Sequence, residues 1–291
     1  MADEFFDVRE VNEGIAGTEF HGRVMHQPVV SSTMDLALGA AQTGARHGVW
    51  IADKQLAGRG RGAKMWHSSA GSPGEAAGLY MTALTAPPIP VLSAVQLSSR
   101  VAIAVQAAIA QTTGLRVRDQ IDIRWPNDLM LARSNDLQRK CGGILIDTAS
   151  NPGSAAGPAM LRYALIGIGI NLNHLAFPPE LDQIATSLRR ELPGAPLLRR
   201  EPLVAAILRE LDEEIRLLIR GWRGTNNKRD RDLNTFSSWL NGKRVRVEPR
   251  PGDQQTAYTG TTAGLDRNGF LRVAADDGGF RTVHSGGLRE L

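Results

Sequence analysis

Residues 55–66 read QLAGRGRGAKMW and place three positively charged side chains among three glycines, ahead of a tryptophan. Glycine makes ordering costly, and the segment has little apolar surface to offset that cost. We therefore expect a ligand to order this loop, and its charges favour an anion. Two interpretations stay open: arginines contacting nucleic-acid phosphates, or glycine N–H groups and arginines surrounding a bound phosphate. The Gly-Lys-Ser/Thr ending of a P-loop does not occur here.

A second candidate is RWPNDLM, residues 124–130. Pro126 halts a regular strand just where Asn127 and Asp128 emerge. Such a pair commonly forms only a turn, but here a cation and a large aromatic residue precede it. Arg124 could hold a phosphate, and Asp128 could accept from a ligand N–H or help to place a magnesium ion.

Lys140 opens a third motif, KCGGILID, at residues 140–147. The two glycines permit a ligand to approach the backbone more closely than side chains would allow. Lys140 is then either a solvated loop residue or a cation beside that ligand. Cys141 is expected to be a small buried hydrophobic residue, and we assign it no chemistry.

A fourth motif, GIGINLN at residues 167–173, lacks side chains at two alternate positions. Because side chains alternate across a strand, Gly167, Gly169 and Asn171 share one face. The glycines predict a groove on that face, where Asn171 could hydrogen-bond a base or a ribose.

Strands and helices that would position these motifs follow from the residue patterns. Ser32 or Thr33 is expected to cap a helix that ends near Gly44. A long alanine-rich helix is expected over residues 91–113, closed by Gly114. The expected strands are those in HGVWIADKQ, GLYMTALTAP, IDIRWPNDLML, CGGILIDTA and YALIGIGINLN.

Residues 201–222 show the clearest helical pattern, with one apolar stripe opposite arginines and acids. The stripe consists of Leu203, Ile207, Leu211, Ile215, Leu218 and Trp222. Beyond a polar, basic linker, four short strand patterns separated by turns indicate a small all-β module. We expect a tail or irregular wrap at 1–23, a main domain at 24–236 and a β domain at 240–291.

The composition is that of an ordinary globular protein of 291 residues with 42% hydrophobic residues. The formal net charge of +4 permits an anionic ligand without identifying one. No run of about eighteen uncharged apolar residues occurs, so we expect no membrane span. The acidic start does not resemble a secretory signal, and the single cysteine fits a reducing compartment. A cytoplasmic enzyme is therefore expected.

Taken together, SST at 31–33, QLAGRGRG, RWPNDL, KCGGILID and GIGINLN resemble the motifs of biotin–protein ligases. The resemblance covers about residues 24–291, and the joint match is specific although each motif alone is weak. It implies an α+β fold with a mixed-sheet catalytic domain, related to class II aminoacyl-tRNA synthetase cores. It also implies that the C-terminal module is an SH3-like domain.

The resemblance implies a role for each matching residue. The residues implied around biotin are Ser32, Thr33, Met34, Gln55, Gly58, Arg59, Gly60, Arg61, Lys140 and Gly143. Those implied around ATP or the adenylate are Trp66, which would cover adenine, Asn127 and Asn171, with Asp128 near the metal ion. The implied catalytic set is Arg61, Lys140, Asp128 and Arg124. Arg61 would also limit escape of the adenylate.

The implied reaction has two steps. Biotin's carboxylate attacks the α-phosphate of ATP, giving biotinyl-5′-AMP and pyrophosphate, and a carrier-domain lysine then takes the biotinyl group. Positive side chains and Mg²⁺ would offset the repulsion between the two anions. The implied partner is biotin carboxyl carrier protein, and the enzyme would be a monomer or a homodimer.

The sequence departs from the family pattern at several positions. Arg124 stands where lysine is common, and the two cations differ in geometry. Met34 stands where asparagine is frequent, so a polar role is not expected there. Some members carry an N-terminal helix-turn-helix, but only some twenty residues precede the catalytic region here. We therefore expect no DNA binding and no repressor function.

Two other functions stay open. Lipoate–protein ligases have a related fold, although the Ser-Thr pair and Gln55 favour a ureido head group over an aliphatic chain. A nucleic-acid-binding module would instead use the arginine–glycine loop and the basic linker, and its binding would depend steeply on salt.

Overall fold

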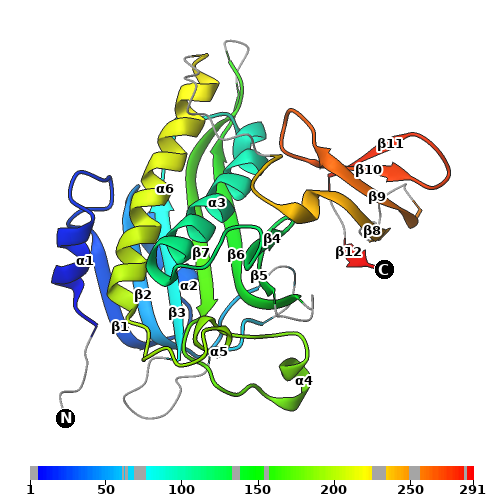
Figure 1. Ribbon diagram of the computed structural model, residues 1–291. Helices are drawn as coiled ribbons and strands as arrows, with labels where there is room; N and C mark the ends of the chain where they lie inside the picture. The colour runs from blue at the N-terminus through cyan, green and yellow to red at the C-terminus, as the bar shows by residue number, and fades with distance from the viewer. Residues whose placement is uncertain are drawn as a thin grey trace.

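Two β-sheets form the framework of the molecule (Figure 1). The computed structural model describes residues 6–60, 62, 65–68, 77–132, 138–153, 157–224, 234–248, 256–284 and 287–291. Within these residues, the larger sheet has seven strands in the order β1 (Val24–Val30), β2 (Gly48–Gln55), β3 (Gly78–Thr85), β7 (Met160–Asn171), β6 (Gln138–Asn151), β5 (Asp128–Ala132) and β4 (Ile121–Arg124). β1 and β2 are parallel, whereas the other neighbours are antiparallel. The expected mixed sheet is confirmed.

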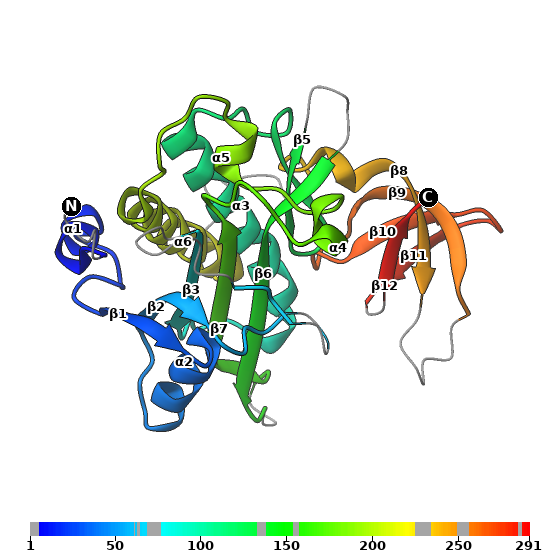
Figure 2. The same ribbon diagram turned by 90° about the horizontal axis from the view of Figure 1, so that it is seen from below.

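Helices cover both faces of this sheet. α3 (Ala94–Thr113) and α6 (Arg200–Trp222) lie on one face, and α2 (Thr33–Gln42) lies on the other (Figure 2). β3 is therefore buried along its entire length. Two short helices, α4 (Pro179–Asp182) and α5 (Leu188–Glu191), follow β7 and were not expected from the sequence.

The expected helix caps are present. The Ser32 side chain accepts from the backbone N–H of Met34 at the start of α2, as an N-cap residue does. Gly114 adopts a left-handed conformation, with φ of 73°, and ends α3. Such a φ is easily reached only without a β-carbon, which explains glycine at this position.

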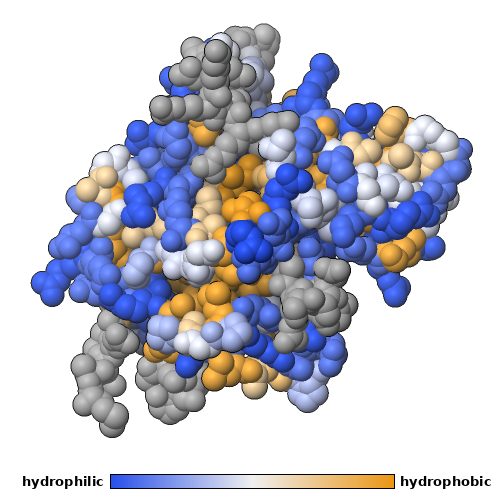
Figure 3. All heavy atoms as spheres, in the orientation of Figure 1, coloured by the Kyte–Doolittle hydropathy of each residue, from blue (hydrophilic) through white to orange (hydrophobic). Residues whose placement is uncertain are grey.

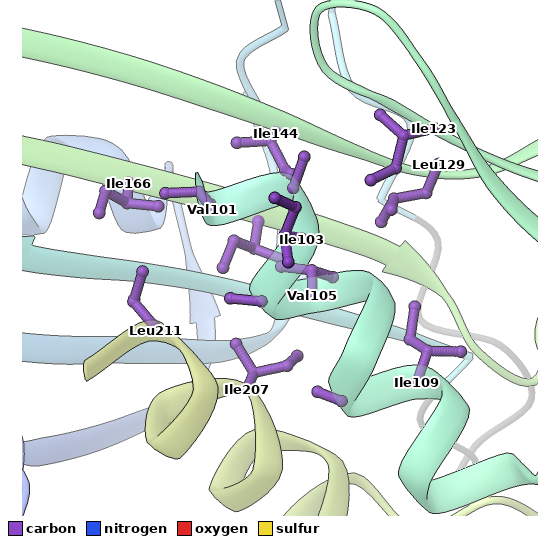
Figure 4. Close-up of a cluster of buried hydrophobic side chains, with 14 of the residues drawn as sticks. Val101, Ile103, Val105, Ile109, Ile123, Leu129, Ile144, Ile166, Ile207 and Leu211 are labelled. Carbon is purple, nitrogen blue, oxygen red and sulfur yellow. The ribbon is translucent and has the colours of Figure 1, made fainter. Parts of the chain in front are cut away.

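The α3 helix is a core element. Its apolar side chains lie between those of α6 and those of the sheet strands (Figure 4). Together with the 3-10 turn η1 (Val91–Ser93), it is long and apolar enough to cross a membrane. However, 61% of its most apolar 18-residue stretch is buried inside the molecule. On the face drawn in Figure 3, apolar residues gather in the middle and polar residues surround them.

The N-terminal residues correct one expectation. Residues 6–23, expected to be a tail or an irregular wrap, include a helix, α1 (Val8–Gly14), that packs against α6. Val11, Ile15 and Phe20 are fully buried in the main core. The weak periodicity concealed this because α1 is short and Val11 is the one buried residue within it.

Two further expectations need correction. The stretch at 121–131, expected as one strand, folds back on itself as β4 and β5, with the turn at Trp125–Pro126 in the cis form. Trp222, placed on the buried stripe of α6, is 48% exposed. It ends the helix, beyond the part that packs on α1 and α3.

The predicted C-terminal all-β module is confirmed as an antiparallel sheet. Its strands among the described residues are β11 (Phe280–Val283), β10 (Leu271–Ala275), β9 (Tyr258–Leu265), β8 (Asn241–Glu248) and β12 (Gly287–Glu290), in that order. The sequence did not predict β12. A 3-10 turn, η2 (Ser238–Leu240), lies between the two sheets and contacts β4 of the larger one and β8 and β9 of the smaller one. There, Ser237 Oγ donates to the Ile123 carbonyl at 2.5 Å.

Candidate active site

The groove predicted beside GIGINLN lies on the α2 face of the large sheet. A β-carbon built on Gly167 would lie 2.9 Å from Met34 Sδ, and one on Gly169 would lie 2.6 Å from Trp66 Cε2. A β-carbon on Gly143 of β6 would lie 3.0 Å from Trp66 Cζ3. Gly167 and Gly169 therefore face the same groove, as predicted. Side chains from α2 and from the arginine–glycine loop enter the space that they leave.

Hydroxyl and amide groups converge at one end of the groove. The Thr33 backbone N–H and hydroxyl donate to Gln55 Oε1 at 2.9 and 3.1 Å. Gln55 Nε2 donates to the Ser68 hydroxyl at 3.2 Å, and Thr82 Oγ1 donates to Thr33 Oγ1 at 2.8 Å. Ser32, which caps α2, is fully buried beside them. Such a set can exchange donors and acceptors with a ureido group.

The protein's own carboxylates bind Arg59 in the loop. Arg59 Nη2 lies 3.0 Å from Asp147 Oδ2, and Nη1 lies 3.4 Å from Asp35 Oδ1. The backbone N–H of Trp66 donates to the Gly58 carbonyl at 2.9 Å. A β-carbon on Gly58 would lie 2.8 Å from the Trp66 carbonyl oxygen, so glycine permits this close contact.

A charge cluster lies at the turn between β4 and β5. Lys140 Nζ is 2.6 Å from Asp128 Oδ1, and Arg124 Nη2 is 2.7 Å from Asp128 Oδ2. Burial raises the pKa of Asp128, but Lys140 and Arg124 outweigh burial and hold that pKa below its ordinary value. The cluster thus carries two cations and one anion, which leaves one net positive charge for an anionic ligand.

An apolar cavity adjoins Lys140. It has a volume of about 270 Å³ and is lined by Trp66, His67, Lys140, Asn171, His174 and Phe177, among others. The His174 and Phe177 rings stack with centroids 5.3 Å apart. Burial, helped by His67, lowers the pKa of His174 to about 4, so its imidazole is neutral at pH 7. A flat heteroaromatic ring would find apolar walls and a few polar groups here.

Trp66 separates this cavity from the polar end of the groove. The space between Thr33, Gln55 and Trp66 has a volume of only about 30 Å³, against about 270 Å³ for the apolar cavity. Trp66 lines both spaces, and its buried Nε1 has no hydrogen-bond partner among the described residues. A ligand that spans both spaces therefore requires the indole to move.

Asn127 and Asn171 occupy different surroundings. Asn171 lines the apolar cavity, and its Nδ2 donates to the Thr186 carbonyl at 3.0 Å. Asn127 Nδ2 donates to the Ile144 carbonyl at 2.8 Å, and the Asn127 carbonyl accepts from the Ile144 N–H at 2.9 Å. Asn127 lines a separate cavity that also includes Phe270, just before β10. Although Asn127 precedes Asp128, its side chain thus faces a different cavity from that of Asn171.

The remaining candidates differ in what the structure describes. Arg61, the loop cation expected to retain the adenylate, lies outside the described residues. Gly60 follows Arg59 and is partly exposed. Cys141 is fully buried, and burial raises the pKa of its thiol to about 12. It is the unreactive core residue that we predicted.

The site offers few ligands for a metal ion. Among the described residues, no group of three or more His, Cys, Asp or Glu side chains could hold one. Both Asp128 oxygens already contact cations. Mg²⁺ prefers one or two carboxylates together with substrate phosphates, so Asp128 fits only as a single ligand to an ion that arrives with ATP.

The sequence did not single out several residues of the site. Asp147 follows Gly143 and Leu145 at alternate positions of β6, so alternation alone would have placed it on the groove face. Asp35, in the first turn of α2, is the other partner of Arg59. His174 and Phe177 follow the last motif in a segment without regular periodicity, so no local signal indicated them.

Comparison with known proteins shows which family this chain belongs to. A model of the biotin/lipoate A/B protein ligase family matches residues 26–171. The chain belongs to this family. Biotin–acetyl-CoA-carboxylase ligase of Mycobacterium tuberculosis is 31% identical to it over 258 residues, which cover 88% of this chain and 84% of the relative.

The chain is also similar to the bifunctional ligase/repressor BirA of Bacillus spizizenii. It is 36% identical over 182 residues, which cover 62% of this chain and 50% of that relative. This chain thus spans about half the length of that relative. In fold it is similar to biotin protein ligase from Aquifex aeolicus in complex with biotin and ATP. The TM-score is 0.66 at 22% identity, covering 93% of this chain and 100% of the other.

Proposed function

We propose that this chain is a biotin–protein ligase that joins biotin, through biotinyl-5′-AMP, to a lysine of a biotin carrier domain. One observation supports this most strongly: the Lys140–Asp128–Arg124 cluster stands beside Trp66, which divides a polar pocket from an apolar cavity. A ureido head group suits the first space, and adenine suits the second. The names of the relatives, which specify biotin, agree with this assignment.

The first step joins two anions. A biotin carboxylate oxygen attacks the α-phosphorus of ATP, the bond to the bridging oxygen breaks, and pyrophosphate leaves. In our proposal, Lys140 and Arg124 turn from Asp128 towards the phosphate and stabilise the charge on its oxygens. A hydrogen bond to a charged group is worth about 1.5–3 kcal/mol net, so these two contribute substantially to the rate. Mg²⁺ bound to ATP would add positive charge at the same place.

The second step transfers the biotinyl group. The carrier lysine's neutral amine attacks the carboxyl carbon of the mixed anhydride, AMP leaves, and the amine releases its proton to solvent or to the AMP phosphate. The depressed pKa of Asp128 makes that carboxylate a weak base. We therefore propose that Asp128 holds Lys140 and Arg124 in place and does not remove the proton.

The proposed loop over the ligand also includes Gly58, Gly60 and Arg61. The residues proposed to contact the ureido head group of biotin are Ser32, Thr33, Met34 and Gln55. Asn171 is proposed to contact the nucleotide, and the same role for Asn127 requires it to leave Ile144. We also propose a reducing, cytoplasmic location and a carrier protein as partner, with the enzyme acting as a monomer or a homodimer.

Two assays test the proposed function. The protein should exchange labelled pyrophosphate into ATP only when biotin is present, and then transfer avidin-detectable biotin to a carrier domain. Silence in both assays would reject it. Lipoate in parallel tests the second activity of the family, and Thr33 and Gln55 favour biotin over it. Binding of DNA or RNA that depends steeply on salt and ignores biotin would instead indicate a nucleic-acid-binding module.

A further inference from the structure

Arg59 joins three elements that line the groove. It belongs to the loop after β2, and it contacts Asp35 in the first turn of α2 and Asp147 on β6. We propose that Asp147 and Asp35 are positioning residues that hold Arg59, and with it the loop, closed over the groove. This inference rests on the proposed function, because it assigns the closed loop the task of retaining the activated intermediate.

The contacts within the loop carry this restraint to Trp66. Arg59 forms a β-bridge with Met65, and the backbone N–H of Trp66 donates to the Gly58 carbonyl at 2.9 Å. The two limbs of the loop are therefore hydrogen-bonded to each other beside Arg59. A carboxylate that fixes Arg59 also fixes the backbone from which the Trp66 indole enters the groove.

The strength of the two ion pairs suits a loop that must open in each cycle. The Arg59 and Asp147 side chains are each 41% exposed, and that of Asp35 is 50% exposed. An ion pair so exposed changes an equilibrium about fivefold at most. Two such pairs favour the closed loop without locking it, so that substrates enter and products leave.

Arginine suits this position better than lysine would. Its planar group presents separate nitrogens to Asp35 and Asp147, whereas one ammonium group reaches such a pair less well. Asp147 makes the shorter contact, at 3.0 Å against 3.4 Å for Asp35. We therefore expect Asp147 to contribute the larger share of the restraint.

Loss of the restraint should release the mixed anhydride before transfer. Asp147→Asn keeps the shape of the side chain and removes its charge. At saturating biotin, the ratio of labelling of lysines on an added bystander protein to biotin-dependent pyrophosphate exchange should rise about fivefold. Asp147→Glu, which keeps the charge, should restore at least half of the difference.

The matched control is Glu213→Gln, which removes a similar exposed ion pair, at 2.9 Å to Arg220, on α6. It should leave bystander labelling unchanged. High salt screens exposed pairs, so raising the salt should increase bystander labelling by wild type more than by Asp147→Asn, which retains only the Arg59–Asp35 pair. Digestion by a protease should cut the loop faster in Asp147→Asn than in Glu213→Gln.

The outcomes separate this inference from the proposed function. Absence of biotin-dependent pyrophosphate exchange in wild type rejects the function, and protease digestion then still tests the restraint on the loop. If wild type is active and Asp147→Asn has the same bystander labelling, salt response and loop cleavage as wild type, the inferred restraint is overturned and the proposed function stands. Adding Asp35→Asn to the variant should deepen each effect, and an unchanged double variant would count against the inference as well.

Discussion

Lys140 lies 2.6 Å from Asp128 through its ammonium nitrogen, and Arg124 holds the other oxygen of the same carboxylate at 2.7 Å. One carboxylate thus keeps two cations close together. Two neighbouring cations repel each other, and an anion between them removes that cost. In the proposed first step, the α-phosphate of ATP replaces Asp128 as their partner.

Replacing Lys140 with alanine should impair adenylate formation far more than folding. The Lys140 side chain is 32% exposed, so its loss should cost little packing. The substitution removes one cation from the cluster, so we expect pyrophosphate exchange to fall by about a hundredfold. The melting temperature should change by no more than a few degrees. Lys54→Ala, on an exposed lysine of β2, is the matched control and should retain full exchange. A parallel loss of stability and activity in Lys140→Ala would indicate a structural role.

Most of the fold could be predicted because its elements carry local signals. The stripe of α6, the left-handed Gly114 after α3 and the alternation in β7 each depend on neighbouring residues. α1 could not be predicted, because its helix is short and its stability comes from packing on α6. The β4–β5 hairpin was missed because its turn consists of residues that equally fit the end of one strand.

The candidate site was predicted in part. Motif spacing and alternation indicated the groove, and Gly167 and Gly169 do face it. The partner of Arg59 was expected to be a ligand anion, but Asp35 and Asp147 supply it within the chain. Ion pairs between distant segments leave no periodic trace, so only the folded structure reveals them.

A methyl group on Gly169 should displace Trp66. The new β-carbon of Gly169→Ala would lie 2.6 Å from Cε2 of the indole, a distance that real contacts do not allow. The indole lies on a loop and can move, so folding should be little affected. The added methyl group itself would occupy part of the groove proposed for biotin, so biotin affinity should fall tenfold or more. Calorimetric titration with biotin measures this. Gly39→Ala, on the exposed face of α2 with nothing within 4 Å, is the control and should bind biotin normally.

Gln55→Ala should open the polar end of the groove. It removes the acceptor of the Thr33 N–H, which is buried with only 3% of Thr33 exposed. An unpaired buried donor costs about 1–3 kcal/mol, and biotin affinity should also fall. Gln55→Glu still accepts from Thr33 but cannot donate to a ligand, so it should preserve folding and still weaken biotin binding. Equal binding by both variants and wild type would remove Gln55 from the site.

Asp122 offers a test of the division into domains at 24–236 and 240–291. It is 2% exposed, and it accepts from the Ser238 N–H at 3.1 Å and from the Ser238 hydroxyl. Asp122→Ala leaves these donors unpaired, at a cost of about 1–3 kcal/mol. We expect calorimetry to separate the unfolding of the two units in this variant. Asp119→Ala, on an exposed aspartate, should unfold like wild type, and a single transition in Asp122→Ala would argue against two separable domains.

His174 should make stability depend on pH. Its pKa is about 4 in the folded chain and about 6.5 when unfolded, because burial, and next His67, disfavour the charged ring. Between these values the unfolded chain binds the extra proton, so the free energy of unfolding should fall as pH decreases from 6.5 to 4. The slope should reach up to about 1.4 kcal/mol per pH unit and vanish below pH 4, where the folded ring is also protonated.

Urea denaturation of wild type and His174→Phe across pH 4–7 measures this dependence. The phenylalanine keeps a ring against Phe177 but does not titrate, so the difference between the two curves isolates His174. A difference for His174→Phe that grows in favour of wild type as pH falls would mean that the folded chain stabilises the charged imidazole. The apolar cavity would then be the wrong description of its surroundings.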